Sequence, residues 1–289
     1  MYRSFDQPDN LGVGRVYNSN VPTPFYHLSL AEGLLEHPAL PEEVRQFLHG
    51  SRCVFLFGST SPDVQVVSGQ PRQSTHFFNL PIQAEDLPAW EQLLLEYPLL
   101  ADAGHIPATQ AIFMAGYLCH LQADWLWVKE IFAPVFGPYC SWGTFSERIF
   151  LHNVLRAYLD ECILPGLHTA MDVCLSRVEP EGWLPFVGDV YLCKWRDFLF
   201  PQLEPGATSQ TVEVFSSRQG VSRPEFKALL ASEERMQAEV FNHLPLRHVQ
   251  SYHQRVLDQN SQLLSKYLAF TLHHRITPID GDVFQGVQT

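Results

Sequence analysis

Residues 107–136 constrain the fold of this chain most, because they form its longest helical apolar pattern. The segment reads PATQAIFMAGYLCHLQADWLWVKEIFAPVF, and its apolar side chains recur at helical spacing until Pro134. A helix that is apolar around most of its circumference belongs inside a protein. This one nevertheless carries His120 and Asp124, two polar side chains that are costly to bury without partners. The segment therefore predicts a core helix with a polar pair that needs an explanation.

The remaining sequence predicts further helices and no convincing strands. Thr23 is a suitable N-cap for a helix that stops before Pro38, and Pro41 and Gly50 suit the start and end of a second one. The pattern of spaced leucines and aromatic residues also predicts helices over 87–100, 145–163 (with Ser146 as a candidate cap) and 223–272, the last broken at Pro245. The expected fold class is mainly α, a multi-helix bundle with a helical C-terminal extension.

Two segments lack a clear helical pattern. Residues 53–75 form a short apolar run followed by small and turn-forming residues, which predicts a loop. Residues 177–222 contain a mixture of Pro, Gly and aromatic residues, which is typical of loops or of an insertion. The chain is therefore expected to form one domain. Its parts are an extended arm over 1–22, a metal-binding helical core over 23–176, and a mixed segment and C-terminal helices over 177–289 that pack on the core.

Composition favours a globular protein and disfavours some kinds of partner. With 289 residues, 46% of them hydrophobic and 17% charged, the chain is long enough and apolar enough to bury a large core. A net charge of −12 disfavours nucleic acid and anionic membranes as main partners. The N-terminus has no apolar signal region, and no apolar stretch reaches about 18 residues, so a cytoplasmic protein without a transmembrane segment is expected. The six cysteines form no C-x-x-C pair, which favours reduced, structural thiols.

The His and Asp residues of the first half form an ordered set. His120 and Asp124 are four residues apart and therefore project from one face of a helix, about 5–6 Å apart at Cβ. His27 lies on the first predicted helix, Asp63 in the loop FGSTSPDV and His76 in STHFFN. Imidazole and carboxylate are ligands for zinc or a similar divalent ion. Convergence of these five residues would form a polar metal pocket inside an apolar bundle.

Each of these residues also has a structural interpretation. A single His on an apolar face is more often a hydrogen-bonded core residue than a ligand, and an i,i+4 His–Asp pair also occurs as an ordinary helix contact. The chain contains 13 His, so chance pairs are common. Structural roles are expected for the C-terminal histidines and for four aromatic residues that could otherwise line a headgroup pocket: His243, His248, His253, His273, His274, Phe77, Phe78, Trp125 and Trp127.

The order H…PD…TH…H-x-x-x-D, with FLFGSTSPD before Asp63 and GYLCHLQAD around His120, resembles the zinc-dependent phospholipase C family. That family shares a mostly helical fold with single-strand-specific zinc nucleases. The resemblance covers roughly residues 20–130 and rests on four short motifs. It implies that Asp63, His76, His120 and Asp124 bind one zinc ion, and that Asp124 bridges to a second ion bound also by His27.

The chain departs from the family pattern at the remaining ligands. An arm of 26 residues precedes His27, whereas the secreted phospholipases begin with a tryptophan whose amino group binds zinc. Glu130 stands where the family has a histidine, and Arg156 follows His152 where a glutamate is expected. Glu147 or Asp160 would have to substitute in a third site, while the structural interpretation is favoured for Glu130 and His152. One or two zinc ions are therefore expected rather than three.

The resemblance implies a zinc-dependent phosphoric ester hydrolase that uses metal-activated water. Its substrate would be a small-molecule or lipid phosphate ester, and Asp63 is the implied general base, with the metal-activated water alone as the rival account. Two alternatives remain open. One is a non-hydrolytic metalloprotein that keeps its ion for folding and binds a partner, and the other is a biosynthetic enzyme that uses the metal as a Lewis acid.

Overall fold

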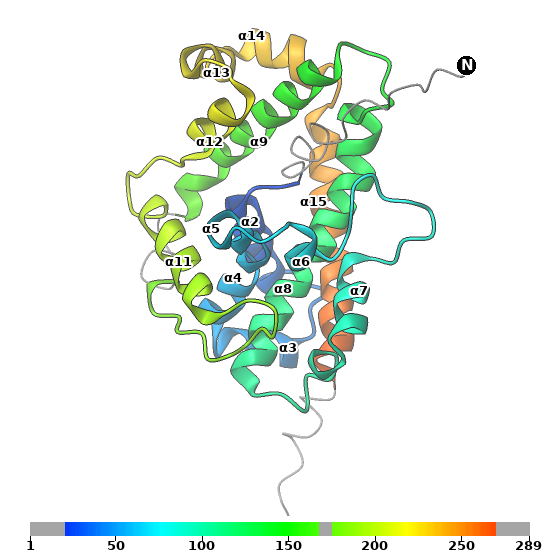
Figure 1. Ribbon diagram of the computed structural model, residues 1–289, viewed down its shortest axis with the longest axis vertical. Helices are drawn as coiled ribbons and strands as arrows, with labels where there is room; N and C mark the ends of the chain where they lie inside the picture. The colour runs from blue at the N-terminus through cyan, green and yellow to red at the C-terminus, as the bar shows by residue number, and fades with distance from the viewer. Residues whose placement is uncertain (1–20, 168–174, 270–289) are drawn as a thin grey trace, which may run out of the picture.

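The computed structural model describes residues 21–167 and 175–269, and all its regular elements within these ranges are helical (Figure 1). The prediction of a mainly α protein is confirmed. Most of the predicted arm over 1–22, as well as His273 and His274, lie outside the described residues. Within the described ranges, no helix combines the length and the apolarity needed to cross a membrane.

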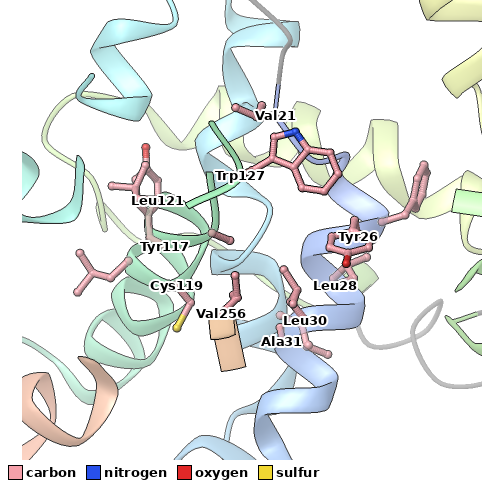
Figure 2. Close-up of a cluster of buried hydrophobic side chains, with 14 of the residues drawn as sticks. Val21, Tyr26, Leu28, Leu30, Ala31, Tyr117, Cys119, Leu121, Trp127 and Val256 are labelled. Atoms are coloured by element: carbon pink, nitrogen blue, oxygen red, sulfur yellow. The ribbon is translucent and has the colours of Figure 1, made fainter. Parts of the chain in front are cut away.

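Two largely buried helices occupy the centre of the molecule. Helix α8 (Ala108–Trp127) has 17 buried residues out of 20, and α2 (Pro24–Leu35) has eight out of 12. Thr23 caps α2 as predicted, because its hydroxyl accepts a hydrogen bond from the backbone N–H of Tyr26. Apolar side chains of α2 and α8 meet those of α15 (Leu246–Tyr267) in one core (Figure 2). Polar residues on α2 and α8 are consequently surrounded by apolar packing.

Helix α4 (Arg52–Gly58) crosses α8 with direct contact between the two backbones. A Cβ on Gly58 would lie 2.1 Å from the carbonyl oxygen of Phe113, and a Cβ on Gly116 would lie 2.1 Å from that of Phe55. Glycine is therefore required at both positions, because any side chain would push the two helices apart. This close crossing brings Ser59, immediately after α4, beside α8.

The prediction of a loop over residues 53–75 is wrong. Most of this segment is helical, in four short pieces: α4, η1 (Ser61–Val64), α5 (Gln65–Ser68) and α6 (Gln73–His76). The apolar run of α4 is buried against α8, so packing stabilises a helix that is too short to form by propensity alone. Gly69 and Phe77 end α5 and α6 in the left-handed conformation, which explains the turn-like composition.

The other helices enclose this central unit. Helix α9 (Phe145–Leu167) packs on α2, and α15 packs on both α8 and α2. The peripheral helices of the first half are α3 (Glu42–His49), α7 (Ala89–Glu96), η2 (Pro98–Leu100) and the π-helical η3 (Val128–Phe136). Those of the second half are α11 (Asp189–Leu199), η4 (Phe200–Gln202), α12 (Thr211–Gln219), α13 (Arg223–Leu230), α14 (Glu233–Arg235) and η5 (Met236–Phe241). Residues 177–222 thus contain helices α11 and α12, and α15 begins directly after Pro245.

Two local expectations need correction. Thr144, rather than Ser146, caps α9: its hydroxyl accepts from the backbone N–H of Glu147, whose carboxylate accepts from the backbone N–H of Thr144 at 2.6 Å. This reciprocal pair is a capping box. The expectation of reduced cysteines is wrong for Cys53, which is disulfide-bonded, while the other described cysteines are free thiols: Cys119, Cys140, Cys162 and Cys193.

Candidate metal centre

Four separate elements bring the five predicted ligands together in the core. His27 comes from α2, Asp63 from η1, His76 from the end of α6, and His120 and Asp124 from adjacent turns of α8. Asp63 is 8% exposed and the other four side chains are at most 2% exposed. The convergence predicted from the sequence is therefore present in the fold.

Asp124 lies at the centre of this group. Its Oδ1 is 3.1 Å from His27 Nε2, and its Oδ2 is 3.5 Å from His76 Nε2 and 3.6 Å from His120 Nε2. His76 Nε2 is also 3.5 Å from Asp63 Oδ1. The rings of His27 and His120 stack with centroids 3.6 Å apart. All three imidazoles therefore direct Nε2 toward the same small space.

Hydrogen bonds at the opposite ring nitrogens fix two of these imidazoles. His120 Nδ1 lies 2.8 Å from the carbonyl oxygen of Ser59, and His76 Nδ1 lies 2.9 Å from the hydroxyl of Thr75. Because a carbonyl oxygen only accepts, Nδ1 of His120 donates, and Nε2 of the neutral ring keeps its lone pair. Such support of the distal nitrogen is typical of metal-binding histidines. The close crossing of α4 and α8 places Ser59 for this role.

The inward-facing atoms lack hydrogen-bond partners among the described residues. These unsatisfied atoms are Nε2 of His27, His76 and His120, together with Asp124 Oδ1. His27 Nε2 lies 3.1 Å from Asp124 Oδ1, but this contact is not aligned as a hydrogen bond. Buried polar atoms without partners cost folding free energy and need an explanation. Two triads have ligand atoms within 4.8 Å of one another: His27–His120–Asp124 and Asp63–His76–His120. A divalent ion would satisfy these atoms, and nitrogen and carboxylate ligands suit zinc.

The electrostatic environment favours the metal-binding forms of most of these groups. Burial disfavours the charged imidazole and lowers the pKa of His76, to about 4, and of His27. For His120, burial acts in the same direction, but the carboxylate of Asp124 outweighs it and raises the pKa of His120. Against the opposing effect of burial, His120 and His27 hold the pKa of Asp124 well below its usual range. Metal binding requires neutral imidazoles and ionised carboxylates.

Arg72 is a member of this cluster that the sequence analysis did not identify. Its Nη2 donates to Asp124 Oδ2 at 2.6 Å, its side chain is 5% exposed, and its guanidinium lies 4.5 Å from the ring centroid of Phe78. The sequence offers one weak signal, because Arg72 precedes His76 by one helical turn. Nothing local to Arg72 indicates a pairing with a residue 52 positions away.

A cavity of about 770 Å³ adjoins the cluster. Of the five candidate ligands, only Asp63 lines it, and Arg72 stands beside Asp63 in the same wall. The other walls combine apolar side chains, such as Phe25 and Phe215, with the polar Asn153 and Arg156. A cavity of this size suits a small organic molecule. Such a molecule would approach the candidate metal centre through Asp63 and Arg72.

The residues considered for a third ion have other roles. Glu130 accepts from Arg255 at 3.1 Å, and Glu147 caps α9. His152 Nε2 accepts from the indole N–H of Trp127 at 2.9 Å. Asp160 accepts from the hydroxyls of Thr23 and Thr211. In the part of the chain described, none of these four residues belongs to a group of side chains that could hold a metal ion.

The aromatic residues considered for a headgroup pocket belong to the core. Phe77, Phe78, Trp125 and Trp127 are all buried, and none of them lines the cavity. Two of the described C-terminal histidines lie outside the core but make ring contacts: the exposed His243 stacks on Trp142, and the half-buried His253 contacts Tyr26.

Asp160 should make stability depend on pH. Burial raises the pKa of Asp160 from 3.8 to about 7. Because the folded chain holds this proton more tightly than the unfolded chain, the stabilising contribution is complete below about pH 4 and is lost as the pH rises through 7, by about 4 kcal/mol at most. We expect Asp160→Asn, which mimics the neutral acid, to remove this part of the decrease in unfolding free energy between pH 5 and pH 8.

Urea unfolding of both proteins at the two pH values measures this difference. Asp258→Asn, a change at a half-exposed carboxylate of α15, serves as the control and should keep the wild-type pH dependence. An Asp160→Asn protein with the same decrease as the wild type would contradict the assignment.

Comparisons with protein-family models, with curated proteins and with solved structures find no match to this chain. The resemblance to zinc-dependent phospholipases C therefore remains an inference from short motifs. The structure itself provides geometry: buried His/Asp groups that could hold a metal ion.

Proposed function

We propose that this chain is a metal-dependent hydrolase of phosphate esters, with zinc as the fitting ion. The proposal rests on two features that lie next to each other: a group of candidate metal ligands and a cavity. Three buried Nε2 atoms and Asp124 Oδ1 lack hydrogen-bond partners, and the ligand atoms of each candidate triad lie within 4.8 Å of one another. Asp63, a member of one triad, opens onto a cavity large enough for a small substrate.

The residues have separable roles in this proposal. His27, His76, His120 and Asp124 hold the ion, which when bound polarises a phosphoryl oxygen and activates water. Asp63 stands where the cluster meets the cavity. The nearby imidazoles of His76 and His120 lower the pKa of Asp63 against the effect of burial, so its carboxylate is ionised and able to accept a proton from water. The apolar walls orient the organic part of the ester and exclude bulk water.

The cavity favours a small-molecule or lipid phosphate ester as the substrate. Arg72 lines the cavity beside Asp63, which places a buried positive charge in the cavity wall next to the candidate centre. Negatively charged esters are the complementary ligands. Phe25 and Phe215 supply apolar contact area for the alcohol portion.

A non-hydrolytic metalloprotein is the second candidate, and the depth of the site favours it. Four of the candidate ligands are at most 2% exposed, as in a closed structural zinc site with four protein ligands. A metal-dependent biosynthetic enzyme that uses the ion as a Lewis acid is a variant of this candidate. Activity measurements distinguish these alternatives from a hydrolase.

Hydrolysis of a chromogenic phosphodiester and of a chromogenic phosphomonoester by zinc-loaded protein tests the proposal. We expect zinc-dependent turnover that a chelator abolishes and added zinc restores. Asp63→Asn should lower kcat by about 100-fold or more, because general-base catalysis contributes about 10²–10⁴-fold. Full zinc occupancy without hydrolysis of any ester would favour the structural metalloprotein instead.

A further inference from the structure

Arg72 occupies a position that a second metal ion would need. In the implied two-ion arrangement, Asp124 bridges the ions with its two carboxylate oxygens. In the structure, Asp124 Oδ2 accepts a hydrogen bond from Arg72 Nη2 at 2.6 Å, which leaves Oδ1 beside His27 as the oxygen without a hydrogen-bond partner. A charge-assisted bond of this length is among the strong ones in proteins. The guanidinium therefore competes directly with an ion for Asp124 Oδ2.

His120 imposes a second limit on the number of ions. The two candidate triads, His27–His120–Asp124 and Asp63–His76–His120, share this one side chain. The Ser59 carbonyl engages Nδ1 of His120, so only Nε2 faces the cluster. A neutral imidazole nitrogen has one lone pair and binds one ion. The two triads cannot both be filled with His120 as a ligand of each.

Charge balance supports a single ion. The cluster contains two carboxylates, Asp63 and Asp124, and one guanidinium, all of them buried. One divalent ion brings the sum of these charges to +1, whereas two ions would bring it to +3. Because unbalanced buried charge is costly, the single-ion state is favoured.

Arg72 also faces the cavity, where a second ion would act on a substrate. Among the residues of the cluster, only Asp63 and Arg72 line the cavity wall. The guanidinium carries five N–H donors in a planar fork, and the contact with Asp124 uses one of them. The guanidinium also lies over the Phe78 ring, 4.5 Å from its centroid, and this cation–π contact stabilises its position. Arg72 is thus a fixed cation at the entrance to the centre.

We propose that Arg72 is the second cation of this centre: the chain binds one divalent ion, and Arg72 binds an anionic oxygen of the substrate's phosphoryl group at the cavity wall. This inference rests on the proposed function for the identity of the anion. It goes beyond that function because it sets the number of metal ions at one and assigns the contact with the anion to Arg72, which belongs to none of the His/Asp motifs found in the sequence.

Zinc stoichiometry and phosphate binding test the proposal without an activity measurement. Wild-type protein is equilibrated with excess zinc, desalted and analysed for zinc per chain, and the zinc-loaded protein is then titrated with inorganic phosphate by calorimetry. We expect one zinc per chain in the wild type and in Arg72→Gln. Phosphate should bind Arg72→Gln about tenfold or more weakly, as expected for the loss of a hydrogen bond between charged groups.

Arg156→Gln is the matched control, since Arg156 is a second buried arginine in the wall of the same cavity. This variant should keep one zinc and bind phosphate within about twofold of the wild type. Arg72→Lys keeps the charge but loses the fork, so it should bind phosphate several-fold more weakly than the wild type. It also provides the test if thermal unfolding shows that Arg72→Gln does not fold.

Three results would overturn the proposal: two or more tightly bound zinc ions per wild-type chain, unchanged phosphate affinity in both Arg72 variants, or an equal loss in Arg156→Gln. The proposed function fails differently. A protein with one zinc and Arg72-dependent phosphate binding that cleaves no ester would refute hydrolysis alone. A protein with two zinc ions that cleaves esters would refute only the single-ion centre.

Discussion

His120→Ala should lose zinc and all zinc-dependent hydrolysis. The substitution removes the one side chain shared by both candidate triads, and with it the Nε2 atom that faces the cluster. Removing a residue that only supports a ligand already costs about 10–100-fold in metal affinity, so loss of a ligand should cost more than about 100-fold. Zinc content after desalting and hydrolysis of a chromogenic phosphodiester are the two measurements.

Asp124→Asn should give the same loss of zinc and a larger loss of stability. The change removes the negative charge that faces His27 and also leaves the buried Arg72 guanidinium without its counter-charge. Breaking one side of a buried ion pair costs about 3–5 kcal/mol. Thermal unfolding in the absence of metal should therefore separate Asp124→Asn from His120→Ala.

The chain contains a matched control for both variants. His37 on the segment after α2 and Asp258 on α15 form another His–Asp pair, with His37 Nε2 3.3 Å from Asp258 Oδ1, outside the cluster. His37→Ala and Asp258→Asn should keep full zinc content and activity. Retention of zinc by both His120→Ala and Asp124→Asn would refute the metal centre.

Gly116→Ala should destabilise the fold by about 3 kcal/mol or more. The added methyl group would lie 2.1 Å from the carbonyl oxygen of Phe55 and 2.7 Å from the backbone N–H nitrogen of Ser59, so α4 must move away from α8. Overpacking of a close contact costs about 1–3 kcal/mol, and a clash with backbone atoms belongs at the upper end or beyond. Zinc affinity should fall as well, because Ser59 moves with α4 and its carbonyl holds His120.

Gly33→Ala is the control for this substitution. Gly33 lies in helix α2, and its added methyl group would meet Leu257 side-chain atoms at 3.6 Å and His253 Nε2 at 3.9 Å, which are ordinary contact distances. Because alanine is the better helix former, this variant should be as stable as the wild type or more stable. Urea unfolding measures both changes, and equal stability of the two variants would show that the helix crossing tolerates a side chain.

The sequence predicted those parts of the structure that depend on local patterns. Helical spacing of apolar residues identified α8, and the N-cap Thr23 identified the start of α2. The same patterns placed His27, His120 and Asp124 on helices, and the structure brings them together with Asp63 and His76. Their role as ligands of zinc stays a prediction.

Features that depend on tertiary packing could not be predicted in the same way. Helix α4 is seven residues long and is stabilised by contact with α8, so its sequence alone carries too little signal. Arg72 pairs with a residue 52 positions away, and no local pattern specifies that partner. The cap of α9 was misassigned because Ser146 and Thr144 are chemically similar, and the reciprocal bonds with Glu147 decide between them.

The placement of Asp63 and Arg72 also has a kinetic consequence. They are the two cluster residues in the cavity wall, and the other candidate ligands are buried behind them in the described structure. An ion would therefore enter and leave by the route that a substrate uses. A molecule bound in the cavity would block access of a chelator to the ion. Metal exchange should accordingly slow as the cavity becomes occupied, so that each bound ligand prolongs the lifetime of the loaded state.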